Sequence, residues 1–435
     1  MPTLFHRDVP VAEVTPSPTG PVLTYEGPWR ASTEAFPVSL SMPLTQEAWP
    51  SEVVLPWLMN LLPEGEPMRA MQRALGVAQE DVLGLISATG GDLAGALRVG
   101  GPRKDQGDYR PVPTPDDLER IIQQLPRRPF LVGDEGVTMS LAGAQDKLPV
   151  ALVDGRIAVP VNGAPSTHIL KPDNPRLPGS VQNEALCMVL AARCRLPTAS
   201  VTTGLAGGRA YLLVDRYDRE GHAPSARRLH QEDFCQALGI PPGSKYERNQ
   251  TGVRGPTLAD MFGVVREHMT AVDTTRLLDA VIFNIAIGNV DSHAKNYSIL
   301  LTAGGVALAP FYDLMSGLLW PGITQNHAQA VGGQVRGRHI QGRHWRRMAQ
   351  ACGLSPAATV RRVIALTDRI QREISAAAEA VEGMPAGGGA FLDGFVQDVT
   401  ERAALVGRNA TRDDDDDHED EQPFARGEAF PSSPR

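Results

Sequence analysis

The feature that most constrains this chain is an apolar run that leads into a polar loop and then into a second apolar run. The first run, Leu277–Ile287, has the pattern of a helix, and the second, Tyr297–Leu301, is typical of a strand. Asp291 and Asn296 lie five residues apart in the loop between them. One side chain can accept a proton and the other can bind a metal ion through a neutral oxygen. The sequence therefore predicts a reactive loop held between two regular elements.

Phosphoryl transfer uses this pair of groups, because a carboxylate accepts the proton of the substrate hydroxyl and a neutral oxygen ligand holds magnesium. The catalytic loop of protein kinases has the same five-residue step from base to Asn. A further carboxylate, Asp313, follows a hairpin-like segment, where a kinase places its second metal ligand. A capped turn between a helix and a hairpin is the alternative interpretation, because Asp and Asn also occur at this spacing by chance.

The composition is that of a globular protein whose folded part is close to neutral. The 435 residues suffice for two or three domains, and contents of 42% hydrophobic and 21% charged residues are typical of globular proteins. The net charge of −8 is dominated by the last 24 residues, which hold nine acids and three bases, a net −6, and so leave about −2 on the remainder. Composition therefore gives no case for direct, independent nucleic-acid binding.

The four cysteines have neither C-x-x-C spacing nor the density of a disulfide framework. Cys187 and Cys194 are seven residues apart in a helix-like run, which favours a place in the core over a role as metal ligands. The sequence shows no signal peptide and no apolar run of about 18 residues. These features together predict a protein of the reducing cytoplasm.

The first 105 residues have the pattern of a separate packing or interface module. Nothing in them has the spacing of a metal site or of a catalytic nucleophile. Pro and Gly punctuate the short apolar stretches. The pattern predicts strands at 22–25 and 38–41 and helices at 53–62, 67–75 and 81–86.

A second polar segment, Ser140–Lys147, lies directly before a predicted strand at 148–153. Its small residues would let backbone amides approach a phosphate group. It contains a single glycine, Gly143, so neither the Walker A pattern nor the G-x-G-x-x-G pattern is met. A plain β-hairpin turn is the alternative interpretation of this segment.

Lys171 ends another strand-like stretch, Thr167–Lys171, and could reach the phosphates of a nucleotide. Glu184, in a helix-like run at 181–194, could pair with it as a kinase helix pairs with the phosphate-binding Lys. The alternatives are a solvated Lys and an acid favoured by the dipole of the first helical turn. The strand Ala210–Tyr217 could lead into a second lobe and bind adenine through its backbone.

Beyond residue 230 the chain is predicted to be largely helical, with a first helix at 231–238 and amphipathic helices at 356–381 and 391–406. An acidic run at 413–421 is expected to stay disordered. A basic stretch precedes the helix predicted at 356–381. It is either a solvated face or a docking site for an acidic partner or a phosphate backbone. Its residues are Arg336, Arg338, Arg343, Arg346 and Arg347.

Several motifs follow one another in a fixed order along the chain. The early ones are Pro37-Val-Ser-Leu-Ser-Met-Pro43, Asn60-Leu-Leu-Pro-Glu-Gly65, Gly91-Asp-Leu-Ala-Gly-Ala96 and Ser140-Leu-Ala-Gly-Ala-Gln-Asp-Lys147. The later ones are His168-Ile-Leu-Lys171, Asn183-Glu-Ala-Leu-Cys-Met188, Leu213-Val-Asp-Arg-Tyr-Asp-Arg219, Leu229-His-Gln-Glu-Asp-Phe-Cys-Gln236, Asn289-Val-Asp-Ser-His-Ala-Lys-Asn296 and Phe311-Tyr-Asp-Leu-Met-Ser316. Over roughly residues 1–380 the series resembles the HipA-type serine/threonine kinases, the toxins of HipBA toxin–antitoxin modules.

The resemblance implies an α+β fold: a two-lobed, protein-kinase-like fold with an added N-terminal α/β subdomain and a largely helical C-lobe. The expected parts are the N-terminal subdomain, an N-lobe with the phosphate loop, a C-lobe with the catalytic loop, and an acidic disordered tail. Their expected bounds are 1–105, 106–217, 218–410 and 411–435.

The resemblance also implies ATP and Mg²⁺ as cofactors and assigns roles to matching residues. Asp291 would accept the substrate proton, Asn296 and Asp313 would bind the metal, and Ser140 would be phosphorylated by the kinase itself, which would inactivate it. The implied ATP-binding residues are Ala142, Gly143, Ala144, Gln145, Asp146, Lys147, Lys171, Asp215, Arg216, Tyr217, Gln231, His293, Ala294, Lys295, Asn296, Tyr312 and Asp313.

The implied function is that of a growth-arresting kinase that phosphorylates an aminoacyl-tRNA synthetase, restrained by a HipB-type helix-turn-helix antitoxin that also binds operator DNA. Two other classes stay open: a small-molecule phosphotransferase and a non-catalytic component of an operator complex. The chain departs from the family in two places. It lacks the Lys of an Ala-Met-Lys-Ile-Gly-Gly segment, having Ala328-Gln329-Ala330-Val331-Gly332-Gly333 instead, and it carries the acidic tail.

Overall fold

The computed structural model describes residues 2–78, 80–101 and 108–413. The chain divides into two compact units and passes between them several times. Unit 1 consists of Met1–Pro172, Gly204–Lys245 and Tyr297–Ala309, and unit 2 consists of Asp173–Thr203, Tyr246–Asn296 and Pro310–Arg435. The domain bounds expected from the sequence stay a prediction. Most of the predicted acidic tail lies outside the described residues.

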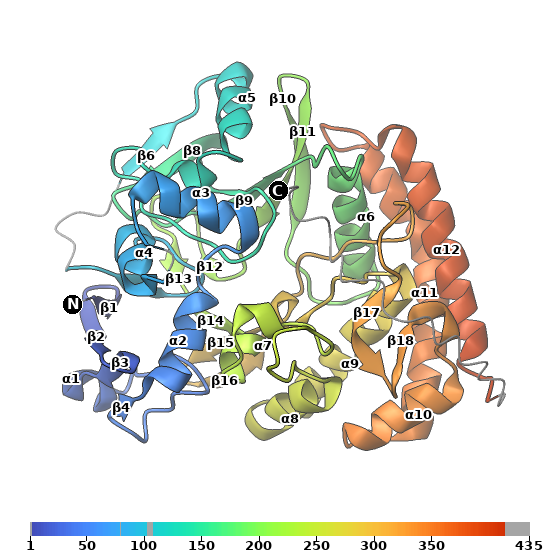
Figure 1. Cartoon of the computed structure of the whole chain (residues 1–435). Coiled ribbons are helices and arrows are strands. Elements are labelled where there is room, and N and C mark those ends of the chain that lie inside the picture. The colour runs from blue at the N-terminus through green and yellow to red at the C-terminus, as the bar shows by residue number, and fades with distance from the viewer. Residues whose placement is uncertain (1, 79, 102–107, 414–435) are drawn as a thin grey trace. The chain divides into compact units, whose positions relative to one another are not determined.

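Unit 1 begins with an antiparallel sheet in the order β4-β3-β2-β1-β5 (Figure 1). Its strands are β1 Thr3–His6, β2 Val9–Ser17, β3 Gly20–Tyr25, β4 Ala48–Trp49 and β5 Leu97–Val99, with helices α1 Gly27–Arg30, α2 Ser51–Met59, α3 Gly65–Leu75 and α4 Val82–Thr89. The strand predicted at 22–25 and the three predicted helices are confirmed. The strand predicted at 38–41 is wrong: the segment is a turn, in which Ser39 Oγ accepts a hydrogen bond from the backbone N–H of Ser41 at 3.2 Å.

The second sheet of unit 1 has the order β10-β11-β9-β7-β8-β6. Its strands are β6 Asp108–Pro111, β7 Leu148–Val153, β8 Arg156–Val161, β9 His168–Pro172, β10 Val201–Ala206 and β11 Arg209–Asp215, and helix α5 spans Pro115–Gln124. The strands predicted at 148–153, 167–171 and 210–217 are therefore confirmed. One apolar core runs through the first and second sheets, with Leu23, Trp57, Leu148 and Leu170 among its buried members.

A smaller sheet, β14-β15-β16, and a strand pair, β12-β13, complete unit 1. These elements are β12 Arg219–Glu220, β13 Arg227–Arg228, β14 His230–Asp233, β15 Ser298–Thr302, β16 Gly305–Leu308 and helix α7 Phe234–Ala237. The helix predicted at 231–238 is therefore wrong over its first residues. Asp233 and Gln236 form a capping box, so helical geometry begins only after Asp233.

A buried cluster of charges joins distant parts of unit 1. Arg219 Nη2 donates to Asp92 Oδ1 at 2.8 Å, and Arg216 Nη2 donates to Asp218 Oδ2 at 2.7 Å. Ser166 Oγ donates to the second oxygen of Asp92 at 2.6 Å. Although burial alone would raise the pKa of Asp92, the neighbouring guanidinium groups hold it far below its usual value. Because each buried charge has several partners, removing one would leave the others uncompensated.

A second polar contact joins the turn at 37–43 to β14 within unit 1. Ser39 Oγ donates to Glu232 Oε2 at 2.5 Å, and the backbone N–H of Leu40 donates to Glu232 Oε1 at 2.8 Å. His230 Nε2 lies 2.9 Å from the carbonyl oxygen of Val38. Burial raises the pKa of Glu232 to about 8, although both hydrogen bonds lower it. The Leu229–Gln236 motif therefore anchors the N-terminal segment.

Unit 2 is largely helical, with one strand pair, β17-β18, among its described residues. Its elements are α6 Ser180–Arg193, α8 Leu258–His268, α9 Ala271–Ile287, β17 Asn326–Val331, β18 Gln334–Arg336, α10 Gly342–Ala351, α11 Pro356–Glu382 and α12 Leu392–Asn409. Helix α11 packs against α6, α9 and α12 (Figure 1). The helices predicted at 181–194, 277–287, 356–381 and 391–406 are confirmed. Cys187 and Cys194 are buried, as predicted.

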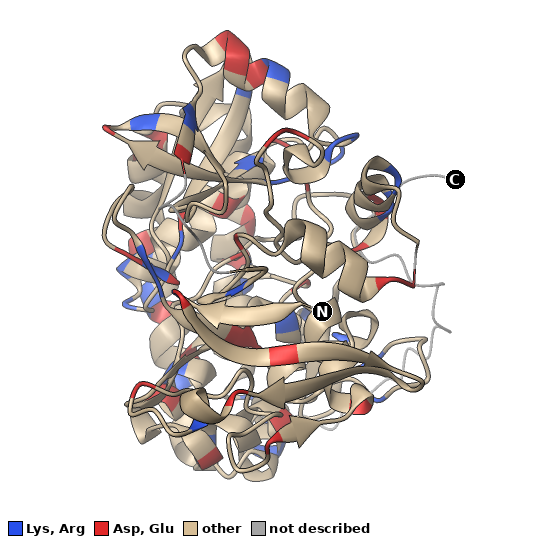
Figure 2. Cartoon of the chain, turned by 90° about the vertical axis from the view of Figure 1, so that its left-hand side faces the viewer, with Lys and Arg blue, Asp and Glu red and all other residues tan. Residues whose placement is uncertain are grey.

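Charged residues of both signs are distributed over the elements that Figure 2 shows from the side. Lys and Arg are interspersed with Asp and Glu along the ribbon in this view. This distribution agrees with the near-neutral charge expected for the folded part. In the described part of the chain, no helix is both long enough and apolar enough to cross a membrane.

Candidate active site

The loop predicted to be catalytic starts where helix α9 stops. Thr270 and Asp273 form a capping box at the start of α9, and the helix ends at Gly288, which is left-handed at φ +69°. A Cβ at Gly288 would lie 2.5 Å from a side-chain carbon of Leu318. Glycine is therefore required here both for its backbone conformation and for lack of space. The chain leaves the buried helix at a fixed angle and enters the loop.

Hydrogen bonds within the loop fix the backbone around Asp291. Asn289 Nδ2 donates to Asn284 Oδ1 in α9 at 2.9 Å, and Asn289 Oδ1 accepts from the N–H of Asp291 at 3.2 Å. The N–H of His293 donates to the carbonyl oxygen of Asp291 at 2.7 Å. Asn296 Nδ2 donates to the same carbonyl oxygen at 2.8 Å. The five-residue step seen in the sequence thus closes into a compact turn that ties Asn296 to Asp291.

Asn296 and Asp313 supply oxygen atoms suited to a hard cation. The side-chain nitrogen of Asn296 is used by Asp291, so its Oδ1 is the atom that can face a metal. Asp313 has φ +56°, an uncommon conformation for a residue other than Gly and one that often marks functional sites. The described residues contain no group of three His, Cys, Asp or Glu that could hold a metal. A site of one amide and one carboxylate fits Mg²⁺, which usually keeps water and binds substrate phosphates as well.

The other residues expected near ATP in unit 2 are held by this turn. Ala294–Asn296 forms a short 3₁₀ helix, in which Ala294 and Lys295 are buried. Tyr312 Oη donates to the carbonyl oxygen of Lys295 at 2.8 Å. His293 is buried as well. The contact from Tyr312 brings the segment that carries Asp313 to the end of the loop.

Tyr246 is a residue of this site that the sequence did not reveal. Its hydroxyl donates a hydrogen bond to Oδ1 of Asp291. Its ring lies edge-on to the ring of His293, with centroids 5.2 Å apart and an interplanar angle of 89°. Tyr246 is 45 residues from Asp291 and has no spacing signature, so only the fold shows that the two meet.

The segment Ser140–Lys147 lies in unit 1, where it contacts the N-terminal motif at 60–65. Ser140 is fully buried, and its Oγ donates to the carbonyl oxygen of Leu61 at 3.2 Å. The N–H of Glu64 donates to the carbonyl oxygen of Gly143 at 3.1 Å. Gly143 has φ +107°, a conformation that only glycine adopts readily. The segment is therefore a loop docked on residues 61–64 and not a plain hairpin turn.

Two lysines reach the same end of the second sheet. Leu148 pairs with Leu170 between antiparallel β7 and β9, so Lys147 and Lys171 occupy the next opposed positions. Lys171 is only 7% exposed, and Lys147 Nζ donates to the carbonyl oxygen of Ala142 within the loop. Ala144, Gln145 and Asp146 complete the loop, and burial raises the pKa of Asp146. The pairing of Lys171 with Glu184 stays a prediction, since Glu184 belongs to unit 2.

The residues predicted to bind adenine also lie in unit 1, at the end of β11. Asp215 Oδ1 is 2.8 Å from His168 Nε2, and the Arg216 side chain belongs to the buried charge cluster. The N–H of Arg216 donates to the carbonyl oxygen of Thr167 at 3.0 Å. Tyr217 Oη donates to Gln231 Oε1 at 2.7 Å. The structure therefore brings Tyr217 and Gln231 together, and their contact with a nucleotide stays a prediction.

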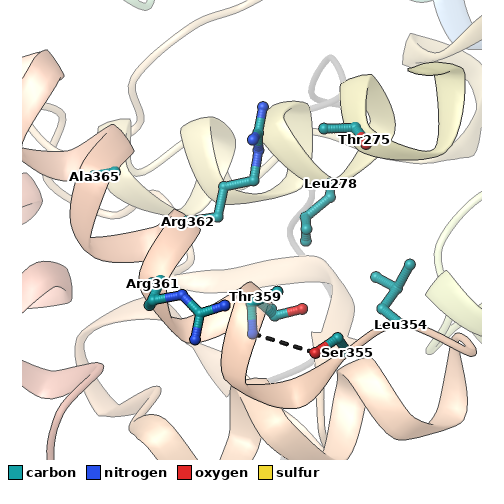
Figure 3. A pocket seen from close by; sticks show the side chains of 9 residues that line it. Thr275, Leu278, Leu354, Ser355, Thr359, Arg361, Arg362 and Ala365 are labelled. Carbon is teal, nitrogen blue, oxygen red and sulfur yellow. Dashed lines mark hydrogen bonds between the residues drawn. The ribbon is translucent and has the colours of Figure 1, made fainter. Parts of the chain in front are cut away.

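A pocket between α9 and α11 is separate from these residues (Figure 3). Thr275 and Leu278 of α9 and Arg362 of α11 are among the residues that line it. Thr275 is twelve residues from the C-terminal end of α9, which corresponds to about 18 Å along a helix. The pocket therefore lies far along α9 from the loop that carries Asp291.

Comparisons with known proteins identify the family of this chain. Residues 139–378 match the family described as the HipA-like C-terminal domain, and residues 3–100 match the HipA N-terminal domain. The chain belongs to the HipA family. It is 38% identical over 397 residues to Y4mE, a protein of Sinorhizobium fredii named as a kinase candidate, covering 88% of this chain and 92% of that one.

Two further comparisons concern HipA of Shewanella oneidensis. The chain is 30% identical to the serine/threonine-protein kinase toxin HipA of that organism, covering 71% of this chain and 72% of the relative. The solved complex of a Shewanella oneidensis HipA with HipB and operator DNA has a chain that matches with a TM-score of 0.79 and 26% identity, covering 94% of this chain and 99% of that chain. The predicted α+β fold and the predicted class, a HipA-type serine/threonine kinase, are confirmed at the level of the family.

Proposed function

We propose that this chain is an ATP-dependent protein serine/threonine kinase that acts as the toxin of a toxin–antitoxin module. The observation that carries the proposal is the turn in which Asn296 is bonded to Asp291, followed by Asp313 in a left-handed conformation. In a HipA-family chain, these three side chains are the kinds of group that phosphoryl transfer requires, a proton acceptor and two metal ligands. Asp291 would accept the proton of the substrate hydroxyl. Asn296 and Asp313 would hold Mg²⁺, which neutralises phosphate charge when bound.

The residues of unit 1 would hold the nucleotide. The amides of the loop Ala142–Lys147, together with Lys147 and Lys171, provide donors and positive charge for the phosphates of ATP. Asp215–Tyr217 and Gln231 would bind the base and sugar. In unit 2, His293–Asn296 and Tyr312 would contribute from the side of the catalytic loop. The near-complete burial of Lys171 supports a fixed role for that residue over a solvated one.

The substrate and partners of the chain are inferred from its family. We expect the protein substrate to be an aminoacyl-tRNA synthetase, whose modification would withhold charged tRNA and arrest translation and growth. The Shewanella oneidensis HipA was solved with HipB and operator DNA. A HipB-type antitoxin is therefore the expected partner of this chain. Contact with operator DNA would run mainly through the antitoxin, because the folded part of this chain is near neutral.

Mass spectrometry of phosphopeptides after brief expression in cells without the antitoxin tests the proposal directly. Wild type should add phosphate to Ser or Thr of a small set of proteins. Asp291→Asn should retain ATP binding and lose roughly 10²-fold or more in turnover, because it removes the proton acceptor. A variant within about threefold of wild type would rule out Asp291 as the base.

Labelling of protein by wild type and by Asp291→Asn separates the proposed kinase from two alternative classes. A small-molecule phosphotransferase would label no protein, itself included, when supplied with radiolabelled ATP. A non-catalytic component of an operator complex would give the same labelling for wild type and Asp291→Asn. Retention of Asp291, Asn296, Asp313 and Lys171 counts against this second class.

A further inference from the structure

Tyr246 contacts the loop that carries Asp291. Tyr246 Oη donates to Asp291 Oδ1, and the Tyr246 ring packs edge-on against His293. Both partners lie in the loop that carries the proposed base. The phenol thus touches the one carboxylate whose orientation decides whether a substrate proton can be accepted.

Tyr246 is held in place by the residue that follows it. The N–H of Glu247 donates to the carbonyl oxygen of Ala328 at 3.0 Å, and the N–H of Ala330 donates to Glu247 Oε2 at 2.7 Å. Ala328 and Ala330 both belong to strand β17. These two hydrogen bonds tie Glu247 to strand β17. They restrict movement of the backbone on the C-terminal side of Tyr246, and so they limit displacement of its side chain.

Strand β17 supports the catalytic loop as well. His327 of β17 is buried, and its Nδ1 lies 3.0 Å from the carbonyl oxygen of Asn289. Burial lowers the pKa of His327 to about 3, so its ring is neutral and can donate from Nδ1 to this carbonyl. Asn289 in turn accepts from the N–H of Asp291. One strand therefore fixes both the donor side and the acceptor side of the Tyr246–Asp291 hydrogen bond.

We propose that Tyr246 is a positioning residue for phosphoryl transfer, an inference that rests on the proposed kinase function. The terminal torsion of an Asp side chain has a broad energy minimum, so a carboxylate without a fixed partner samples many orientations. The hydrogen bond from Tyr246 holds Oδ1 and thereby keeps Oδ2 in one orientation toward an incoming hydroxyl. Tyr246 transfers no proton itself. Its contribution is to keep the base aligned, and misalignment is costly to rate.

Tyr246→Phe tests this assignment, because it removes the hydroxyl and keeps the ring that packs on His293. Phosphate transfer from radiolabelled ATP should slow about tenfold, both in the single-turnover rate constant for labelling of the chain itself and in kcat for casein. A hydrogen bond to a charged group has this order of effect. KM for ATP should stay within about twofold of wild type. Tyr109→Phe is the matched control, since it removes a hydroxyl that donates to the Pro165 carbonyl at 3.1 Å in unit 1, and it should leave kcat unchanged.

Two further variants separate positioning from general damage. Glu247→Ala leaves Tyr246 in the chain but removes its anchor on Ala330, and it should lower kcat with KM for ATP preserved. In an Asp291→Asn background, Tyr246→Phe should cost less than about a further twofold, because the carboxylate on which it acts is gone. Full additivity of the two substitutions would overturn the assignment.

The remaining outcomes are also decisive. A Tyr246→Phe enzyme that is faster than wild type would show that the phenol blocks the base, and one with wild-type kcat would show that it does nothing to the base. Either result contradicts the positioning role while leaving the kinase function intact. A wild-type chain that labels neither itself nor casein would instead contradict the proposed function, and the inference with it.

Discussion

At the scale of single residues, the backbone of Asp313 is the most informative local feature. Its φ of +56° is one that Asp and Asn tolerate better than other side chains, because their short polar groups can bond locally. The conformation is unusual enough to need support from the surrounding structure. A carboxylate placed this way after the turn at 291–296 supports the proposed role of Asp313 in binding Mg²⁺.

Comparing two substitutions at Asp313 separates charge from backbone strain. Asp313→Asn and Asp313→Ala should both weaken magnesium-dependent ATP binding by at least tenfold, because both remove the carboxylate. Only Asp313→Ala should also lose about 1 kcal/mol of stability, since Ala tolerates the left-handed region poorly. Calorimetry with Mg-ATP and thermal melting measure the two effects.

Asp154 offers a matched control, because it is also left-handed, at φ +49°, and lies in the exposed turn between β7 and β8. Asp154→Asn should leave the affinity for Mg-ATP unchanged. Wild-type affinity in either Asp313 variant would contradict the assignment of Asp313 as a metal ligand.

The separation of residues along the sequence decides which residues of this candidate site can be predicted from the sequence. Asp291, Asn296 and Asp313 are at most 22 positions apart, so their spacing could be matched to a known chemical arrangement. Tyr246 meets Asp291 across 45 positions. Tyrosines are also commonplace in cores and turns, and nothing in the local pattern around Tyr246 predicts a bond to a carboxylate.

At the scale of elements, periodicity predicts the long helices and the core strands well. It fails where a side chain bonds to nearby backbone. The turn at 38–41 has an apolar-polar alternation like a strand, but Ser39 bonds to Ser41 and to Glu232. Residues 231–233 resemble the start of a helix, yet they pair with β15, and Asp233 caps the helix that follows. In both places a local side-chain bond is combined with a distant partner, Glu232 for the turn and β15 for residues 231–233, and a short window of sequence does not contain the distant partner.

The loop Ser140–Lys147 is the element on which regulation is proposed to act. A phosphate on Ser140 would add close to two negative charges to a hydroxyl that is fully buried against the carbonyl of Leu61. The docked position cannot accommodate that group, so the modified loop should leave it, and ATP affinity should fall. Wild type incubated with Mg-ATP should gain one phosphate at Ser140 and lose activity, as followed by intact-mass measurement and kinase assay.

Three variants test the loop prediction. Asp291→Asn should gain no phosphate, and Ser140→Ala should remain active for longer than wild type under the same conditions. Ser87→Ala, which changes an exposed serine on α4, should behave like wild type. A phosphosite elsewhere, or a Ser140-phosphorylated form that binds ATP normally, would refute the switch.

At the scale of the whole molecule, the two compact units are each assembled from several separated stretches of chain. In unit 1, residues matched by the HipA N-terminal domain are bonded to residues far along the chain, as Asp92 is to Arg219. The sequence motifs contain these residues, but the motifs alone do not show which contacts the residues make. The resemblance predicts nucleotide binding for Gln231 of the Leu229–Gln236 motif, and the structure shows that His230 and Glu232 of the same motif anchor the turn at 37–43.

The pH dependence of stability provides a test of this anchoring. Glu232 has an ordinary pKa of 4.5 and a pKa of about 8 when buried in the fold. Between these values the folded chain keeps the proton while the unfolded chain has lost it. The free energy of unfolding should therefore fall as pH rises, by up to about 1.4 kcal/mol per pH unit. This loss of stability is absent below pH 4.5 and is complete above pH 8.

Glu232→Gln should remove that slope, because an amide does not titrate and can still bond to both Ser39 and the N–H of Leu40. Wild type and variant should be similarly stable near pH 4.5. At pH 8.5 the variant should be the more stable by about 5 kcal/mol in denaturant unfolding, which is the slope of about 1.4 kcal/mol per pH unit taken from pH 4.5 to pH 8. Glu220→Gln, at an exposed ion pair with Arg227, should change stability little at either pH. A variant that is less stable than wild type at pH 8.5 would mean that Glu232 is ionised in the fold and that its charge is needed to hold the N-terminal segment.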